Sequence, residues 1–245
     1  MSRFSSTVTV QGRQGQEGTT LVELLVGMLI AAILSTLIIG TWWALTQSYA
    51  NTVRRGEATD FARLGLSRLE REIRDAQNPP PDVADVAVVR ARPWYIVLYT
   101  TFNEAGNQSG SVAPRLVMYR LYSNGELWRF QDVNGDGVIS GVDIGVDSWP
   151  GVTFNLAERT SGEGAQLLAS NLVNASVPST ANPTPLFTYL SYNPDGSLAR
   201  ASDVRGTNSR AQIKGVEINV LVDLNPGKSP VYTHLRTTAQ IRNTR

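Results

Sequence analysis

The sequence predicts an α+β protein, with a long N-terminal helix whose first half is of membrane-spanning length packed on an antiparallel β-sheet domain. Three observations predict this class. Residues 24–45 form an apolar run without charge, a helical pattern of apolar residues continues to about residue 77, and alternating strand patterns separated by turn sequences fill much of the remainder.

The apolar run of residues 24–45 consists mostly of Leu, Ile, Val, Ala and Trp. About 22 residues, each rising about 1.5 Å, span a hydrocarbon core of about 30 Å. Glu23 stands at the start of this run. A charged side chain inside a membrane costs about 2.5–3.5 kcal/mol, so such a residue is by default a functional hypothesis. The first 17 residues are polar and Gly18 precedes the run, an order unlike that of an ordinary secretory signal.

These residues resemble the leader of type IV prepilins and type II secretion pseudopilins. In that family the prepilin peptidase cuts after a glycine, the new N-terminus is methylated, and the fifth mature residue is glutamate. Gly18 matches the glycine before the cut, Thr19 the new N-terminus and Glu23 the fifth mature residue. Where this chain has Thr19, the family usually has phenylalanine or another apolar residue. The resemblance implies a leader at residues 1–18 and a transmembrane, filament-core helix at residues 19–46.

The resemblance also gives Glu23 a role in assembly. Cleavage would create an ammonium group at Thr19, with which Glu23 of a neighbouring subunit could pair in a helical filament. Buried ion pairs add little net stability but strongly penalise a missing partner, which suits a residue that sets register. The implied partners are the prepilin peptidase, other pilin or pseudopilin subunits and, before assembly, the cytoplasmic membrane. The chain would cross that membrane once, with its C-terminal domain outside the cytoplasm, and then enter a pilus or pseudopilus.

Residues 47–78 are expected to continue the helix as an amphipathic segment. Apolar residues recur at steps of three to five, at Ala58, Phe61, Leu64, Leu69, Ile73 and Ala76. Charged residues occupy the other faces, and three prolines at 79–81 end the helix. This stripe predicts a helix packed on the core of the following domain.

Residues 79–245 are expected to form an extracytoplasmic β-rich domain, an antiparallel sheet with one buried face. Strand patterns occupy residues 94–99, 115–122, 127–130, 187–192, 216–224 and 231–241. Asn124 and Gly125 predict a hairpin, and the sequence Pro-Asp-Gly at 194–196 predicts a second turn. A short helix is expected at residues 165–173. A long helix on an antiparallel sheet is also the pilin-like architecture that the leader resemblance implies.

Residues 132–143 have the spacing of a calcium-binding loop. The expected ligands are Asp132, Asn134, Asp136, the carbonyl of Val138, and Asp143, which stands where glutamate is usual. Gly137 permits the sharp turn and Ile139 can enter the core. The pattern resembles the dockerin-type EF-hand loop, which also ends in aspartate. Asn-Gly-Asp-Gly is also good turn chemistry without an ion. We expect calcium to fix the loop structurally, and we do not expect a sensor that opens a groove.

Composition narrows the function classes. The chain has no cysteine, which excludes disulfides, thiolate zinc sites and a cysteine nucleophile. A net charge of +1 without a basic tract gives no support for nucleic-acid binding. The single histidine, His234, lies in a strand pattern and reads as a surface residue, and no nucleophile elbow, phosphate loop or zinc-protease motif is present. The sequence leaves a glycosidase with a carboxylate pair open, but we predict a protein that is not an enzyme.

The C-terminal residues 213–245, with Arg242 and Asn243 near the end, resemble the larger minor components of the family, the W-type minor pilin and the J-type pseudopilin. The resemblance implies a minor pilin or pseudopilin, a structural subunit of a type IV pilus or type II secretion pseudopilus. The alternative is a membrane-anchored, calcium-stabilised module that binds a cell surface, carbohydrate or matrix. Cleavage after Gly18 separates the two.

Overall fold

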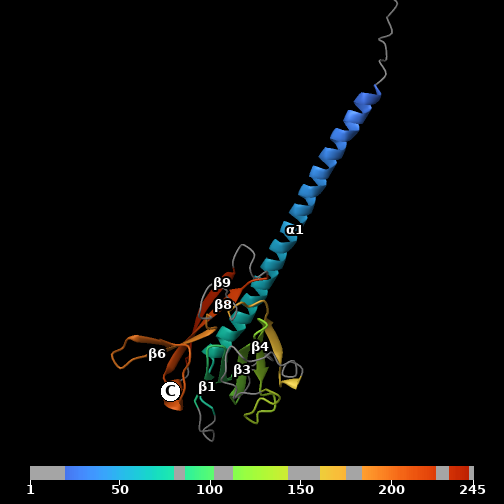
Figure 1. The fold of residues 1–245 in the computed structure, drawn as a ribbon. Helices are drawn as coiled ribbons and strands as arrows, with labels where there is room; N and C mark the ends of the chain where they lie inside the picture. The colour runs from blue at the N-terminus through green and yellow to red at the C-terminus, as the bar shows by residue number, and fades with distance from the viewer. Residues whose placement is uncertain are drawn as a thin grey trace, which may run out of the picture. The chain divides into compact units, whose positions relative to one another are not determined.

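A computed structural model describes residues 20–79, 86–101, 113–142, 161–174, 184–224 and 232–242. The chain divides into two compact units, Met1–Asn51 and Thr52–Arg245, which are described separately. Figure 1 shows helix α1 and the strands of the second unit, with β3 and β4 in green and β8 and β9 in red. The order of elements is one long helix followed by strands, which confirms the α+β class.

Helix α1 comprises Leu21–Arg74. In the first unit its residues 21–49 are all exposed, and the helix is long and apolar enough to cross a membrane. This part confirms the expected apolar helix. Soluble monomers rarely leave contiguous apolar surface of this extent exposed.

The predicted end of the helix was four residues too late. The helix stops at Arg74, and Ala76 forms an isolated bridge with Thr100 while the Gln77 N–H donates to the Tyr99 carbonyl at 3.0 Å. Ala76 is fully buried. The chain therefore leaves the helix before the prolines, because tertiary pairing with strand β2 (Tyr95–Thr100) satisfies its backbone groups.

The buried face of α1 also differs from the predicted stripe. Phe61 and Leu64 are 40% and 71% exposed, respectively. The buried residues are Ala62, Gly65, Leu66, Leu69, Glu72 and Ile73. A Cβ atom added at Gly65 would lie 2.5 Å from the carbonyl oxygen of Leu168, so only glycine permits this close approach of the helix to the strand backbone.

The first sheet has five antiparallel strands in the order β1-β2-β3-β4-β5. Besides β2, these are β1 (Val88–Ala91), β3 (Arg115–Leu121), β4 (Leu127–Gln131) and β5 (Gln166–Ala169). Strand β2 is buried at all six residues, and two separate apolar clusters include residues from alternating positions of β2 and β3. The expectation of one buried face was therefore wrong for this sheet, which is covered on both faces.

Strand β5 replaces the short helix expected at residues 165–173. Leu167 lies opposite Trp128 and Ala169 opposite Leu127, with a register shift between the two pairs. The local composition did not indicate a strand, and pairing with β4 decides its conformation. The predicted Asn-Gly hairpin is confirmed between β3 and β4, where Gly125 has φ 80°, a conformation that favours glycine.

The second sheet has four antiparallel strands in the order β7-β6-β8-β9. They are β6 (Phe187–Tyr192), β7 (Leu198–Ala201), β8 (Ile213–Val222) and β9 (Thr233–Gln240), with helix α3 (Thr207–Ala211) between β7 and β8. The second predicted turn joins β6 and β7, where the Gly196 N–H donates to the Asn193 carbonyl at 2.9 Å. Residues of α1 and both sheets share one apolar core. Two sheets thus stand where one was expected.

Candidate functional site

Glu23 lies in the first turn of α1 and closes a capping box with Thr20. The Thr20 N–H and hydroxyl each donate to Glu23 Oε2 at 3.0 Å, and the Glu23 N–H donates to Thr20 Oγ1 at 3.3 Å. This reciprocal arrangement satisfies backbone donors that a helix start leaves unpaired. The pattern Thr-x-x-Glu at residues 20–23 is visible in the sequence, but the leader resemblance, which concerns Gly18, Thr19 and Glu23, gives no role to Thr20. Gly18 and Thr19 lie outside the described residues.

The apolar part of α1 satisfies its own polar groups. Ser35 donates to the Ala31 carbonyl at 2.7 Å, Thr36 to Ile33 at 2.8 Å, and Thr41 to both Leu37 and Ile38 at 3.0 and 2.9 Å. In lipid every polar group needs an internal partner, and hydroxyl-to-carbonyl bonds within one helix provide it. The segment therefore presents apolar surface to a lipid or to an apolar neighbour.

The predicted calcium loop follows β4 and is built around Asp132, which is 1% exposed. Its Oδ1 accepts from the Gly135 N–H at 2.6 Å and its Oδ2 from the Gly137 N–H at 2.8 Å. Asp136 Oδ1 accepts from the Val138 N–H at 2.9 Å. An ionised carboxylate has about four acceptor positions, so Asp132 retains capacity for a cation.

The other predicted ligands have mixed positions. Asn134, Asp136 and Val138 are exposed, and Asp143 lies outside the described residues. Ile139 is 1% exposed and belongs to one of the two apolar clusters that cover the first sheet. Burial of Ile139 confirms its predicted role. Within the parts of the chain that the structure describes, no three acidic or histidine side chains gather as a metal site.

Glu163 lies outside this loop but binds its backbone, and the sequence did not predict it. Its Oε1 accepts from the N–H groups of Val133 and Asn134 at 2.6 and 2.9 Å, and its Oε2 from Ser140 at 3.2 Å. Its backbone also bonds both ends of the loop, because Gln131 N donates to Glu163 O and Glu163 N donates to Ser140 O. Nothing in the sequence pairs Glu163 with donors 23 to 30 residues away.

Charge at Glu163 is favoured by these donors. Desolvation acts to raise its pKa, but the N–H groups of Ser140, Asn134 and Val133 outweigh it and bring the pKa below the ordinary 4.5. The loop is thus organised by two carboxylates, Asp132 from within and Glu163 from outside. An anionic, backbone-organised loop of this kind can accept a hard cation on its exposed side chains.

Glu72 forms a buried ionic network between α1 and the first sheet. Its side chain has no exposed surface, and Oε1 accepts from Arg129 Nε at 2.9 Å and from Arg68 Nε at 3.2 Å. The Tyr119 ring lies beside it: burial and the Glu72 charge raise the pKa of the Tyr119 hydroxyl well above its ordinary value. Arg68 also donates to Gln166 of β5. The network links the helix to β3, β4 and β5.

His234 is exposed on β9, as predicted for a surface residue. Comparison of the sequence with models of known protein families and with curated proteins gave no match.

Proposed function

We propose that this chain is a minor pilin or pseudopilin, a structural subunit of a type IV pilus or type II secretion pseudopilus. It is made as a precursor with a leader at residues 1–18, cut after Gly18 by a prepilin peptidase and methylated at Thr19. It then waits in the cytoplasmic membrane with its C-terminal domain outside the cytoplasm, and α1 carries it into the filament. It has no catalytic role.

One observation carries the proposal: a single carboxylate, Glu23, lies in the first turn of the apolar part of α1, whose residues 21–49 are all exposed. The next charged residue along the chain is Arg54. The helix begins at Leu21, two residues after the proposed new N-terminus at Thr19, so the mature chain is helical almost from its first residue. A filament that buries such helices together removes Glu23 from water, and the Thr19 ammonium of a neighbour supplies the opposite charge.

Calcium belongs to this proposal as a structural ion in the loop of residues 132–143. The support is the ligand spacing together with the wrapping of the loop backbone around Asp132. The ion would bind oxygens of Asp132, Asn134, Asp136, Val138 and Asp143. It would neutralise negative charge at the end of β4 and hold the loop against Glu163.

N-terminal processing tests the proposal. The mature protein, purified from cells that hold a prepilin peptidase, should begin at Thr19, and intact-mass analysis should show one added methyl group. Gly18→Val should leave the precursor uncut, because only a minimal side chain is expected to fit beside the cut. A mature chain beginning at another residue contradicts the proposal, and an N-terminus retained in such cells favours the anchored binding module instead.

A further inference from the structure

The depth of α1 in a bilayer is not determined by charged residues. Glu23 and Arg54 bound an uncharged stretch of residues 24–53, which at about 1.5 Å per residue is about 45 Å long. A hydrocarbon core is about 30 Å thick. The stretch exceeds the core by about 15 Å, or about ten residues, so another feature has to select which part lies in lipid.

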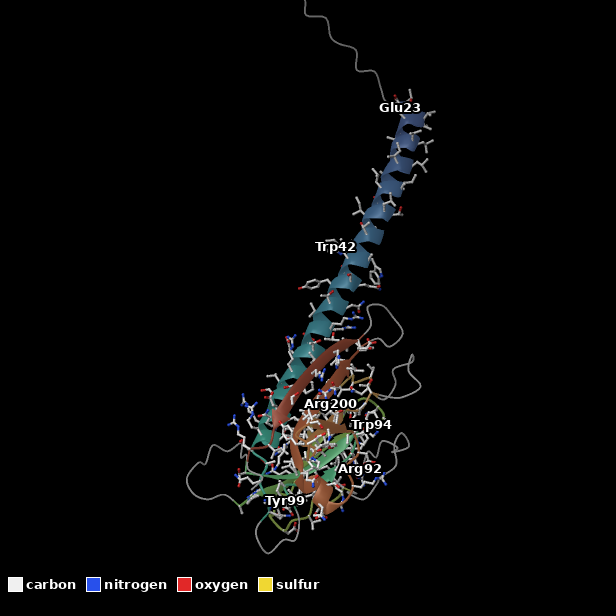
Figure 2. All side chains as sticks on the ribbon, turned by 90° about the vertical axis from the view of Figure 1, so that its left-hand side faces the viewer. Glu23, Trp42, Arg92, Trp94, Tyr99 and Arg200 are labelled. Carbon is white, nitrogen blue, oxygen red and sulfur yellow. The ribbon has the colours of Figure 1, made fainter. Side chains whose placement is uncertain are left out.

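Trp42 and Trp43 are placed to make that selection. Both are exposed, by 73% and 67%. Figure 2 labels Trp42 on the long helix α1. They follow Glu23 by 19 and 20 residues, a rise of about 28–30 Å that matches one hydrocarbon thickness. An indole combines a large apolar ring with one N–H donor and is most stable at the level of lipid headgroups.

Polar side chains are few between these boundaries and frequent beyond Trp43, where Thr46 likewise donates to a helix carbonyl, that of Trp42, at 2.9 Å. Between Glu23 and Trp42 the polar side chains are Ser35, Thr36 and Thr41, all of which donate to carbonyls of the same helix. Beyond Trp43 the sequence turns polar, with Thr46, Gln47, Ser48, Tyr49 and Asn51.

We infer that Trp42 and Trp43 bind the headgroup layer of the bilayer and set the depth of the unassembled subunit, with Glu23 at the opposite boundary. The inference rests on the proposed membrane-inserted precursor. Its consequence is that Glu23 does not wait at the bilayer centre. The carboxylate stays near water, capped by Thr20, and becomes buried only when the subunit joins a filament.

The experiment uses the full chain, which has no cysteine of its own, so that single cysteines report cleanly. Cysteines are placed one at a time at Ile39, Gly40, Leu45, Thr46 and Gln47. The protein is expressed without other pilin subunits, so that no neighbour can protect it. A membrane-impermeant maleimide, added from the side of the globular unit, should label positions 45–47 at least about tenfold faster than positions 39 and 40.

Three paired variants complete the test. W42L/W43L should move the onset of labelling by about one turn toward Ser48, whereas W42Y/W43Y should keep it in place because tyrosine also favours the interface. I38L/I39L, studied with the cysteines at 45–47 and at Gly40, should change nothing. The inference is overturned if, with both tryptophans present, positions 45–47 are labelled as slowly as positions 39 and 40, or if W42L/W43L leaves the onset unchanged. Cleavage after Gly18 is measured separately. An uncut chain that shows the expected onset of labelling contradicts the proposed function but not this inference.

Discussion

Removal of the Glu72 carboxylate should severely destabilise the second unit. In Glu72→Ala the Arg129 guanidinium, whose side chain is 4% exposed, loses the carboxylate that accepts from its Nε. Leaving one member of a buried pair uncompensated costs about 3–5 kcal/mol. Domains of ordinary size have about 5–15 kcal/mol of total stability, so this one change should remove a large part of it. Arg68 keeps a partner in Gln166, so we assign most of the loss to Arg129.

A paired apolar replacement distinguishes the charge from the packing. In Glu72→Leu with Arg129→Met neither ion is buried, and replacing a whole buried pair by apolar residues is often neutral or stabilising by about 1–4 kcal/mol. The double variant should therefore unfold at a higher denaturant concentration than Glu72→Ala. The matched control is Asp60→Ala, which breaks the exposed pair with Arg63, whose side chains are 71% and 64% exposed. That loss should be about 0–1 kcal/mol.

The assay is urea unfolding at pH 7 of the fragment that begins at Thr52, followed by tryptophan fluorescence. Trp94 and Trp128 are 6% and 8% exposed in this unit, so unfolding should change their emission. Free energies come from linear extrapolation, with slopes compared among variants. A loss for Glu72→Ala no larger than that for Asp60→Ala would refute the reasoning, because it would mean that the Arg129 charge is not confined by the fold.

Three further predictions concern the candidate sites. Glu23→Gln keeps an acceptor for the capping box but removes the charge, whereas Glu23→Ala removes both. If Glu23 pairs with a neighbour's ammonium, both variants should still be cleaved but should be absent from sheared filaments and from purified subunit complexes. Normal incorporation of Glu23→Gln would leave helix capping as the role of Glu23. Calcium at 100 times its dissociation constant should stabilise the fragment from Thr52 by about 2.7 kcal/mol, measured as a higher Tm with calcium than with chelator. Asp136→Ala should abolish that rise, while Asp132→Ala should also lower the Tm in chelator because the N–H groups of Gly135 and Gly137 lose their acceptor. Equal Tm values for the parent protein across millimolar calcium would show a simple turn. Because the pKa of Glu163 is lowered in the folded state, its contribution to stability is present above the ordinary pKa of 4.5 and is lost as the pH falls through the folded-state pKa. In urea titrations Glu163→Gln should therefore be less stable than the parent protein at pH 7, but its unfolding free energy should fall less on acidification. Parallel pH profiles for the two proteins would contradict this.

The sequence predicted only some of the residues of the candidate sites. Glu23 stands out because one carboxylate at the edge of a long apolar run is visible by itself, and its partner Thr20 lies three residues away in a known capping pattern. The buried position of Ile139 followed from its place in the loop pattern. Glu163 and Glu72 were not predicted, because the donors to Glu163 and the Arg129 partner of Glu72 lie 23 to 57 residues away, and local spacing carries no information about such contacts.

The sequence by itself determined the long apolar helix, the strands of the β domain with strong alternation and the Asn-Gly hairpin, because these depend on interactions between residues a few positions apart. Tertiary structure decided the end of α1 at Arg74, the strand at Gln166–Ala169, the exposure of Phe61 and Leu64, and the division of the strands between two sheets. Each of these depends on pairing or packing between distant segments. Where the local preference is weak, as in four-residue strands, the energy of those distant contacts exceeds it and selects the conformation.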